Sequence, residues 1–205
     1  YILKDYPDER KYCFAYSKVV KDIALRQYAQ TLKPQWDEMY WQAMLWEAPM
    51  LLDSYCLYIE KNRKPQERFY QPRRKTLKRV VDKLQALEDD ELDELFIHMP
   101  ARVGKSQIIT LGTSWHCGRD TEKSNLYVTY KEGLGGAFLD GVMEIWTDPT
   151  YCHNDVFHHK VARTDAKNHK VDLDRKKKYA TLSGKGLESG LNGEYDAYGW
   201  LILDD

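Results

Sequence analysis

The chain lacks the features that mark membrane proteins, disulfide-bonded secreted proteins and zinc proteins. Its 205 residues contain no apolar run long enough to cross a bilayer, and the opening Tyr-Ile-Leu-Lys-Asp-Tyr-Pro does not have the pattern of a signal peptide. Only four cysteines occur, scattered without a CxxC pair. This spacing favours free thiols in a reducing compartment over a disulfide framework or a structural zinc site.

Metal-binding spacing is also missing among the six histidines. Cysteine, histidine and aspartate side chains gather between residues 152 and 159, but no second ligand pair elsewhere completes a zinc pattern. We therefore expect Cys152, His153, Asp155, His158 and His159 to be ordinary surface or loop residues.

An excess of charge of one sign is missing as well. The chain has 31 basic and 32 acidic side chains, so it has no overall basic field that would attract nucleic acid. Basic residues gather locally in two patches, at 73–79 and at 175–178. Each patch alone is more often a solvated surface, and any contact with DNA has to be local.

Glycine does not occur before Gly104, which is typical of a helical segment. Apolar residues in this part recur at helical spacing in three stretches, 19–28, 35–47 and 51–61. A polar stretch then ends in Pro65. We predict a helical N-terminal region over residues 1–65 and a second domain over residues 66–205.

The second domain alternates expected strands with expected helices. The strands are expected up to about Met99, at 125–130, in short pieces within 159–183 and at 198–203, with helices at about 105–116 and 133–146. Alternation of this kind predicts an α/β fold with a mainly parallel sheet flanked by helices.

Gly104, Lys105 and Ser106 have the spacing of a nucleotide-phosphate loop between the first strand and a helix. In such a loop, N–H groups at the helix N-terminus face the phosphates, the lysine adds a point charge and the hydroxyl binds Mg²⁺. The full pattern GxxxxGK[ST] is not met, because Met99 stands at the first glycine position. The alternative is an ordinary surface helix start.

Two carboxylates stand at the end of the last expected strand. Asp204 follows an apolar run at the carboxyl end of the strand, where α/β sheets place their ligands. We predict that Asp204 orders Mg²⁺ and that Asp205 polarises the attacking water. Without the phosphate loop, both would be read as exposed acids.

Three more residues are candidates for contact with the nucleotide. Arg102 lies inside the loop, where its charge can meet the γ-phosphate, although a solvated loop arginine is equally consistent. The Gln71 amide offers a donor and an acceptor to an adenine edge, and the Tyr70 ring can stack on a base.

These motifs together resemble the N-terminal ATPase domain of the large terminase subunit of tailed bacteriophages. Residues 99–106, Met-Pro-Ala-Arg-Val-Gly-Lys-Ser, are similar to the Met-Pro-Pro-Arg-x-Gly-Lys-Ser loop of that family, which also lacks the first glycine. Further matches in the same order are the Tyr70-Gln71 pair, residues 126–130 with Phe138 and Tyr151, the glycine loop 190–193 and the Walker B strand 201–205. The resemblance covers about residues 69–205, and residues 1–65 match no pattern.

The resemblance implies a P-loop NTPase fold of the ASCE type and an ATPase that drives double-stranded DNA into a procapsid, with ATP and Mg²⁺ as cofactors. It places ATP contacts at Tyr70, Gln71, Arg102, Val103, Gly104, Lys105, Ser106 and Gln107, and catalytic groups at Arg102, Lys105, Asp204 and Asp205. The implied partners are DNA, the portal protein, the small terminase subunit and further copies of the chain, in the host cytoplasm and without a membrane. A coupling motif and a nuclease domain would follow residue 205.

Two other functions remain open from the residues themselves. One is a helicase-like P-loop ATPase acting on nucleic acid, which residues beyond 205 would distinguish from a terminase. The other is a scaffold that binds nucleotide without turnover, against which Lys105, Ser106 and Asp204 argue because all three are present.

Overall fold

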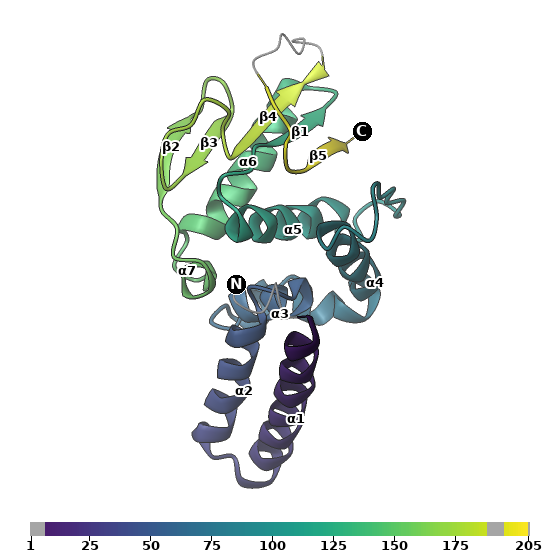
Figure 1. The fold of residues 1–205 in the computed structure, drawn as a ribbon, viewed down its shortest axis with the longest axis vertical. Coiled ribbons are helices and arrows are strands. Elements are labelled where there is room, and N and C mark those ends of the chain that lie inside the picture. Colours follow the sequence, from purple (N-terminus) through teal and green to yellow (C-terminus); the bar gives the residue numbers. More distant parts are fainter. Residues whose placement is uncertain (1–6, 188–194, 205) are drawn as a thin grey trace.

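The computed structural model describes residues 7–187 and 195–204. Helices and strands follow in the order α1 (Pro7–Thr31), α2 (Pro34–Glu47), α3 (Leu52–Ile59), the short 3₁₀ helix η2 (Pro65–Glu67), α4 (Tyr70–Glu88), α5 (Lys105–Arg119), β1 (Asn125–Thr129), α6 (Glu132–Thr147), α7 (His153–Val156), β2 (Val161–Asp165), β3 (Lys170–Leu173), β4 (Leu182–Gly186) and β5 (Leu201–Asp204). Helices thus fill the first half of the chain, as expected, and all five strands lie in the second half (Figure 1).

Helices α1 and α2 form an antiparallel hairpin that projects away from the rest of the molecule (Figure 1). Pro34 begins α2, where a missing backbone N–H costs nothing. The hairpin is tied to α3 through Glu47, whose Oε2 accepts hydrogen bonds from Lys21 Nζ at 2.5 Å and from Ser54 Oγ at 2.6 Å. The Phe14 ring packs edge-on against Trp46.

Helices α3 and α4 pack with α5 in a layer beneath the sheet, and one hydrophobic core runs through all of them. The buried carboxylate of Glu60, just after α3, accepts hydrogen bonds at 2.9 Å from the backbone N–H groups of Phe69 and Tyr70. These groups have no partner within the first turn of a helix, so Glu60 caps α4. The predicted boundary at Pro65 therefore falls between elements whose side chains share one core.

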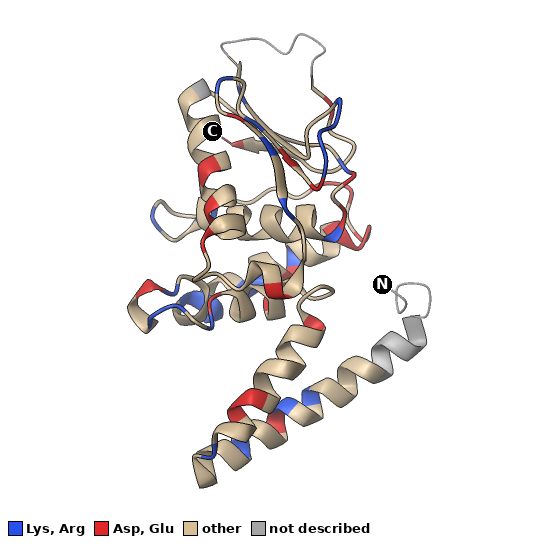
Figure 2. Cartoon of the chain, turned by 90° about the vertical axis from the view of Figure 1, so that its left-hand side faces the viewer, with Lys and Arg blue, Asp and Glu red and all other residues tan. Residues whose placement is uncertain are grey.

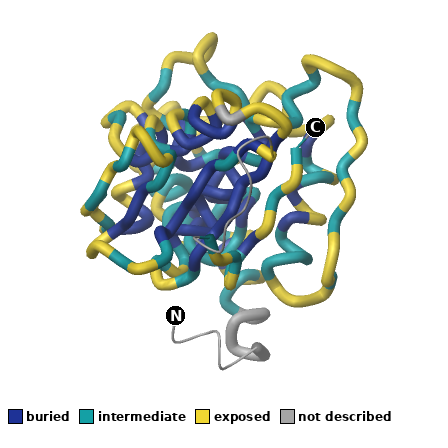
Figure 3. Tube along the Cα trace, turned by 90° about the horizontal axis from the view of Figure 1, so that it is seen from above, coloured by how far each residue is buried: buried dark blue, intermediate teal, exposed yellow. Residues whose placement is uncertain are grey.

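The sheet has five strands in the order β2-β3-β4-β1-β5. Strand β1 runs parallel to both of its neighbours, β4 and β5, whereas β3 runs antiparallel to β2 and to β4. The buried Asn125 side chain joins the parallel part, because its Nδ2 donates to Thr181 O at 2.9 Å and its Oδ1 accepts from Trp200 N at 2.6 Å. The inner strands β1, β3 and β4 are mainly buried, whereas the edge strands β2 and β5 are partly exposed (Figure 3).

Two sequence-based expectations about the sheet are wrong in part. The sheet is mixed rather than mainly parallel, because the chain returns through a hairpin between β2 and β3. The segment before the phosphate loop, residues 94–100, is not a strand. Its side chains do alternate, with Leu95, Ile97 and Met99 half-buried between exposed neighbours, but no backbone hydrogen bond joins this segment to another part of the described chain. Strand formation requires such a partner.

The cysteines and the hydropathy agree with expectation. All four cysteines are free thiols. Among the helices formed by residues 7–187 and 195–204, none has the length and apolar content needed to cross a membrane.

A buried polar cluster connects four helices. The Tyr55 hydroxyl from α3 lies 2.8 Å from Ser114 Oγ of α5 and 2.7 Å from His153 Nδ1 of α7, and Trp146 Nε1 of α6 donates to Ser114 Oγ at 2.9 Å. His153 is therefore not the surface residue that its sequence neighbourhood indicated. Burial, helped by the nearby charge of His159, lowers the pKa of His153 to about 3.

This shift predicts how stability depends on pH. In the unfolded chain His153 takes up a proton near pH 6.5, whereas the folded chain resists this down to about pH 3. The unfolded state then binds more protons, so the free energy of unfolding falls as the pH drops below 6.5, by about 2 kcal/mol between pH 7 and pH 5. Denaturant unfolding over this range should show a flatter profile for His153→Asn, which keeps an acceptor for Tyr55. The control is His158→Asn at an exposed position; equal slopes for wild type and His153→Asn would contradict the prediction.

Candidate functional site

The loop before α5, which the sequence predicts to bind phosphate, contains two residues with positive φ. Gly104 is the N-cap of α5 with φ 111°, and Arg102 has φ 65°. A Cβ atom on residue 104 would lie 2.6 Å from Phe69 Cζ, so any larger residue would require the ring to move. The first turn of an α-helix has N–H groups without an acceptor inside the helix, and such groups can bind an anion.

Lys105 and Asp204 come together although they lie far apart in the chain. Lys105 Nζ lies 2.9 Å from Asp204 Oδ1. Asp204 is the last residue of β5, at the carboxyl end of a strand that is parallel to β1. The structure therefore brings together the start of α5 and the carboxylate at the end of β5, the two places where the sequence predicts the halves of a nucleotide site.

Tyr127 on β1 also contacts this carboxylate, and the sequence reading did not identify it. Its hydroxyl donates to Asp204 Oδ2 at 2.6 Å. Burial, and then the adjacent carboxylate, raise the pKa of the Tyr127 phenol, so it remains a neutral donor at neutral pH. The register pairs Thr129 with Asp204, and alternation along β1 puts Tyr127 on the same face as Thr129. The alternation of side chains along β1 is therefore the sequence signal that could have identified Tyr127.

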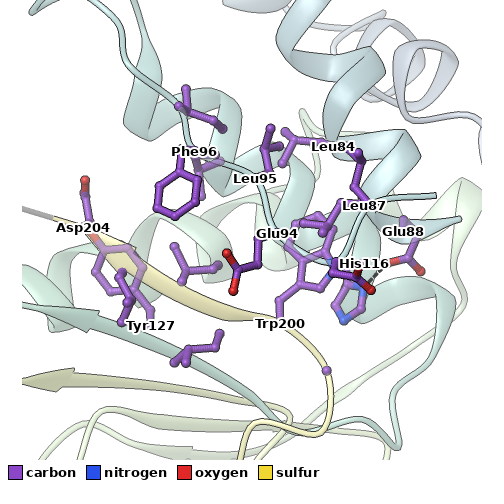
Figure 4. A pocket seen from close by; sticks show the side chains of 18 of the residues that line it. Leu84, Leu87, Glu88, Glu94, Leu95, Phe96, His116, Tyr127, Trp200 and Asp204 are labelled. Carbon is purple, nitrogen blue, oxygen red and sulfur yellow. Dashed lines mark hydrogen bonds and ion pairs between the residues drawn. The ribbon is translucent and has the colours of Figure 1, made fainter. Parts of the chain in front are cut away.

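A cavity of about 700 Å³ extends from this site along the edge of β5 (Figure 4). Lys105, Ser106 and Asp204 line one end, and His116 and Trp200 line the other. One wall is the unpaired segment 94–97 and the opposite wall is β5, so the lining is mainly apolar with a few acids.

The far end of the cavity holds a second group of charged side chains. His116 Nδ1 pairs with Glu88 Oε2, Arg119 Nη1 lies 3.3 Å from Glu88 Oε1, and the His116 ring stacks on Trp200. Burial of Glu88 opposes its ionisation, but the hydrogen bond from His116 and the Arg119 charge hold the pKa of the carboxyl below its usual value. No signal in the sequence connected these residues, because they lie on different elements.

The residues predicted to read the base are placed differently from the expectation. Tyr70 is fully buried in the first turn of α4, and its hydroxyl donates to Asp53 Oδ1 at 2.6 Å, so its ring offers no face to a nucleotide. This stacking prediction is wrong, because the ring belongs to the core between α3 and α4. Gln71 is exposed and accepts from Arg68 Nη1 at 2.7 Å. It is Phe69 that contacts the phosphate loop, at Gly104.

The other predicted residues lie on the loop and the first turn of α5. Arg102 and Ser106 are exposed, and Val103 and Gln107 are half-buried. The remaining candidate, Asp205, and the glycine loop at 190–193 lie outside the described residues.

The metal prediction rests on two residues only. No cluster of three or more histidine, cysteine, aspartate or glutamate side chains suited to a metal occurs in the described parts of the chain. Ser106 and Asp204 line the same cavity. One hydroxyl and one carboxylate suit Mg²⁺, which in nucleotide sites takes its remaining ligands from phosphates and water.

The basic patches are partly used within the fold. Lys177 is half-buried and donates to Thr121 O and Thr181 Oγ1, and burial lowers its pKa. Lys176 and Lys178 are exposed. In the other patch, Arg74 forms a bidentate pair with Asp53 at 3.0 and 2.7 Å. Acidic residues lie among the basic ones along much of the chain (Figure 2).

No family model, curated protein or solved structure was found to match the chain. The function therefore has to be argued from the geometry of the site.

Gly104 provides a test of the loop conformation. Gly104→Ala should lower the free energy of unfolding by about 1–3 kcal/mol, because an L-residue is strained at φ 111° and its Cβ meets Phe69. Chemical denaturation measures the change. Gly133→Ala is the matched control: it lies in α6 with no atom within 4 Å of an added Cβ and should be neutral or slightly stabilising. Equal stability of Gly104→Ala and wild type would refute this loop geometry.

Proposed function

We propose that this chain is the ATP-hydrolysing domain of a DNA-translocating motor, of the kind found in the large terminase subunit. The observation that carries the proposal is the 2.9 Å contact between Lys105, at the start of α5, and Asp204, at the carboxyl end of β5. A phosphate-binding lysine and a metal-binding acid have to meet in this way in a P-loop ATPase. The proposed fold is accordingly a P-loop NTPase domain of the ASCE type.

Each group of the site has a defined part in this proposal. The N–H groups of the first turn of α5 bind phosphate oxygens, and Lys105 exchanges Asp204 for the β- and γ-phosphates. Ser106 and Asp204 would hold Mg²⁺, which would supply positive charge to the transferred phosphoryl group. Arg102 is exposed beside the loop and adds positive charge there. Asp205 remains the proposed group that polarises the attacking water.

The base is proposed to bind near the start of α4. Phe69 packs against Gly104, so the first turn of α4 lies beside the phosphate loop. Gln71 is exposed at that end, and its amide reads adenine once Arg68 releases it. The DNA, the portal protein, the small terminase subunit and an oligomeric assembly follow from the family resemblance alone.

A nucleotide-binding scaffold and a helicase-like ATPase are the competing functions. A scaffold would bind ATP without turnover. A helicase-like enzyme would hydrolyse ATP but separate strands instead of moving along intact duplex. Measuring ATP turnover with and without duplex DNA, and then strand separation, distinguishes the three.

Lys105→Ala tests the ATPase proposal. We expect ATP turnover to fall by about 10²–10³-fold or more, because one charge that stabilises the transferring phosphoryl group is lost. The thermal midpoint should hardly change, since the Lys105–Asp204 pair is partly exposed and such pairs contribute little to stability. Lys167→Ala, an exposed lysine on the β2–β3 hairpin, is the control. Unchanged turnover in folded Lys105→Ala, or no turnover in the wild type, would sink the proposal.

The exposed part of the basic patch at 175–178 is the better candidate for DNA. The double variant Lys176→Ala with Lys178→Ala should weaken binding to duplex DNA and reduce the dependence of log K on log salt by up to about 2, without changing ATP affinity. Lys177 is left intact because it holds the fold. The comparison is Lys75→Ala with Arg79→Ala in the other patch. If that pair alone weakens DNA binding, the two patches are assigned the wrong way round.

A further inference from the structure

Both oxygens of the Asp204 carboxylate have a partner, and the two partners differ in rigidity. Lys105 Nζ approaches Oδ1 at 2.9 Å from a flexible side chain that is 32% exposed. Tyr127 OH approaches Oδ2 at 2.6 Å from a ring that is 5% exposed. The lysine contact can therefore be exchanged for a ligand, whereas the tyrosine contact is built into the sheet.

Tyr127 is held in place by close packing of α6 on the sheet. Its ring stacks on Phe138 of α6, with ring centres 3.8 Å apart and planes 4° from parallel. Gly184 lies beside Tyr127 on the adjacent strand β4. A Cβ atom at Gly184 would lie 2.6 Å from Gly135 O, so a pair of glycines permits α6 to come near enough for this stacking.

The strand register then directs the hydroxyl. Tyr127 pairs with Ile202 and Thr129 pairs with Asp204. The Tyr127 hydroxyl therefore contacts a carboxylate that lies two residues beyond its own pairing partner on β5. Figure 4 shows the Tyr127 ring beneath Asp204 at the end of the cavity. The contact thus needs the parallel pairing of β1 with β5 as well as the stacked ring.

We propose that Tyr127 is a positioning residue for Asp204. The hydrogen bond from the Tyr127 hydroxyl would hold Asp204 Oδ2 in place, so that Oδ1 would be available to Mg²⁺ once Lys105 binds the phosphates. A hydrogen bond of this kind fixes the orientation of a metal-binding carboxylate, and its loss commonly costs 10–100-fold in metal affinity or activity. This inference rests on the proposed function, because the metal arrives with the nucleotide.

The test uses Tyr127→Phe, which retains the ring and its stacking and removes one hydroxyl. Binding of Mn²⁺ in the presence of a non-hydrolysable ATP analogue is measured by electron paramagnetic resonance. We expect the affinity for Mn²⁺ to fall about 10-fold, while the affinity for the analogue without metal is unchanged. Tyr16→Phe, on the exposed surface of α1, makes the same chemical change away from the site and should behave as wild type.

Two further variants, Phe138→Leu and Lys105→Ala, distinguish a failure of the positioning role from a failure of the proposed ATP site. Phe138→Leu loosens the ring but keeps the hydroxyl, and it should weaken Mn²⁺ binding less than Tyr127→Phe does. The positioning role is overturned if Tyr127→Phe binds Mn²⁺ as tightly as the wild type does. The proposed ATP site still stands in that case, provided that the wild type binds Mn²⁺ with the analogue and that Lys105→Ala weakens nucleotide binding. If the wild type binds neither analogue nor metal, both proposals fall.

Discussion

The arrangement of this protein depends on the burial of α5 on every side. From Thr110 to Gly118 each residue of this helix is buried, so its polar side chains need partners inside the protein. Those partners come from separate elements: Trp115 Nε1 donates to Ala48 O at 2.9 Å, Ser114 bonds Tyr55 and Trp146, and His116 pairs with Glu88. The helix that begins at the phosphate loop is thereby held in one orientation by the helices below it and by α6 beside the sheet.

The site combines this fixed helix with a strand at the edge of the described sheet. Among the described strands β5 pairs with β1 alone, and on its other side a cavity separates it from the segment at 94–97. Backbone pairing therefore fixes β5 less firmly than it fixes β1, which has a neighbour on both sides. Side-chain contacts at Asp204 compensate, because Lys105 and Tyr127 connect the strand end to α5 and to the centre of the sheet. The carboxylate is consequently held between α5 and the centre of the sheet.

Local pattern predicted the elements well, and the contacts between elements much less well. The helices after Gly104 and Lys131 and the strands at 125–129 and 201–204 follow from periodicity and from glycine at a position of positive φ. Residues 95–99 have the alternation of a strand, but strand formation depends on a partner edge that no local pattern reveals. Tyr70 shows the same limit, because only the packing of α3 against α4 puts its ring in the core and its hydroxyl on Asp53.

The mixed sheet also places Asp204 and the basic run at 175–178 in different parts of the molecule. Carboxyl ends of parallel strands meet at one edge, and that is where Asp204 lies in contact with Lys105. The run of basic residues lies instead beyond β3, in the connection to β4, where the fold requires polar partners for its own backbone. Asp172 accepts from Thr181 N, and Lys177 bonds Thr121 O, so the lysine in the middle of this run serves the hairpin. A cluster of positive charge counted along the chain therefore overstates the charge that a nucleic acid can meet. Arg175 pairs with Glu122, and the exposed Lys176 and Lys178 lie in the β3–β4 connection, away from Asp204 at the end of β5.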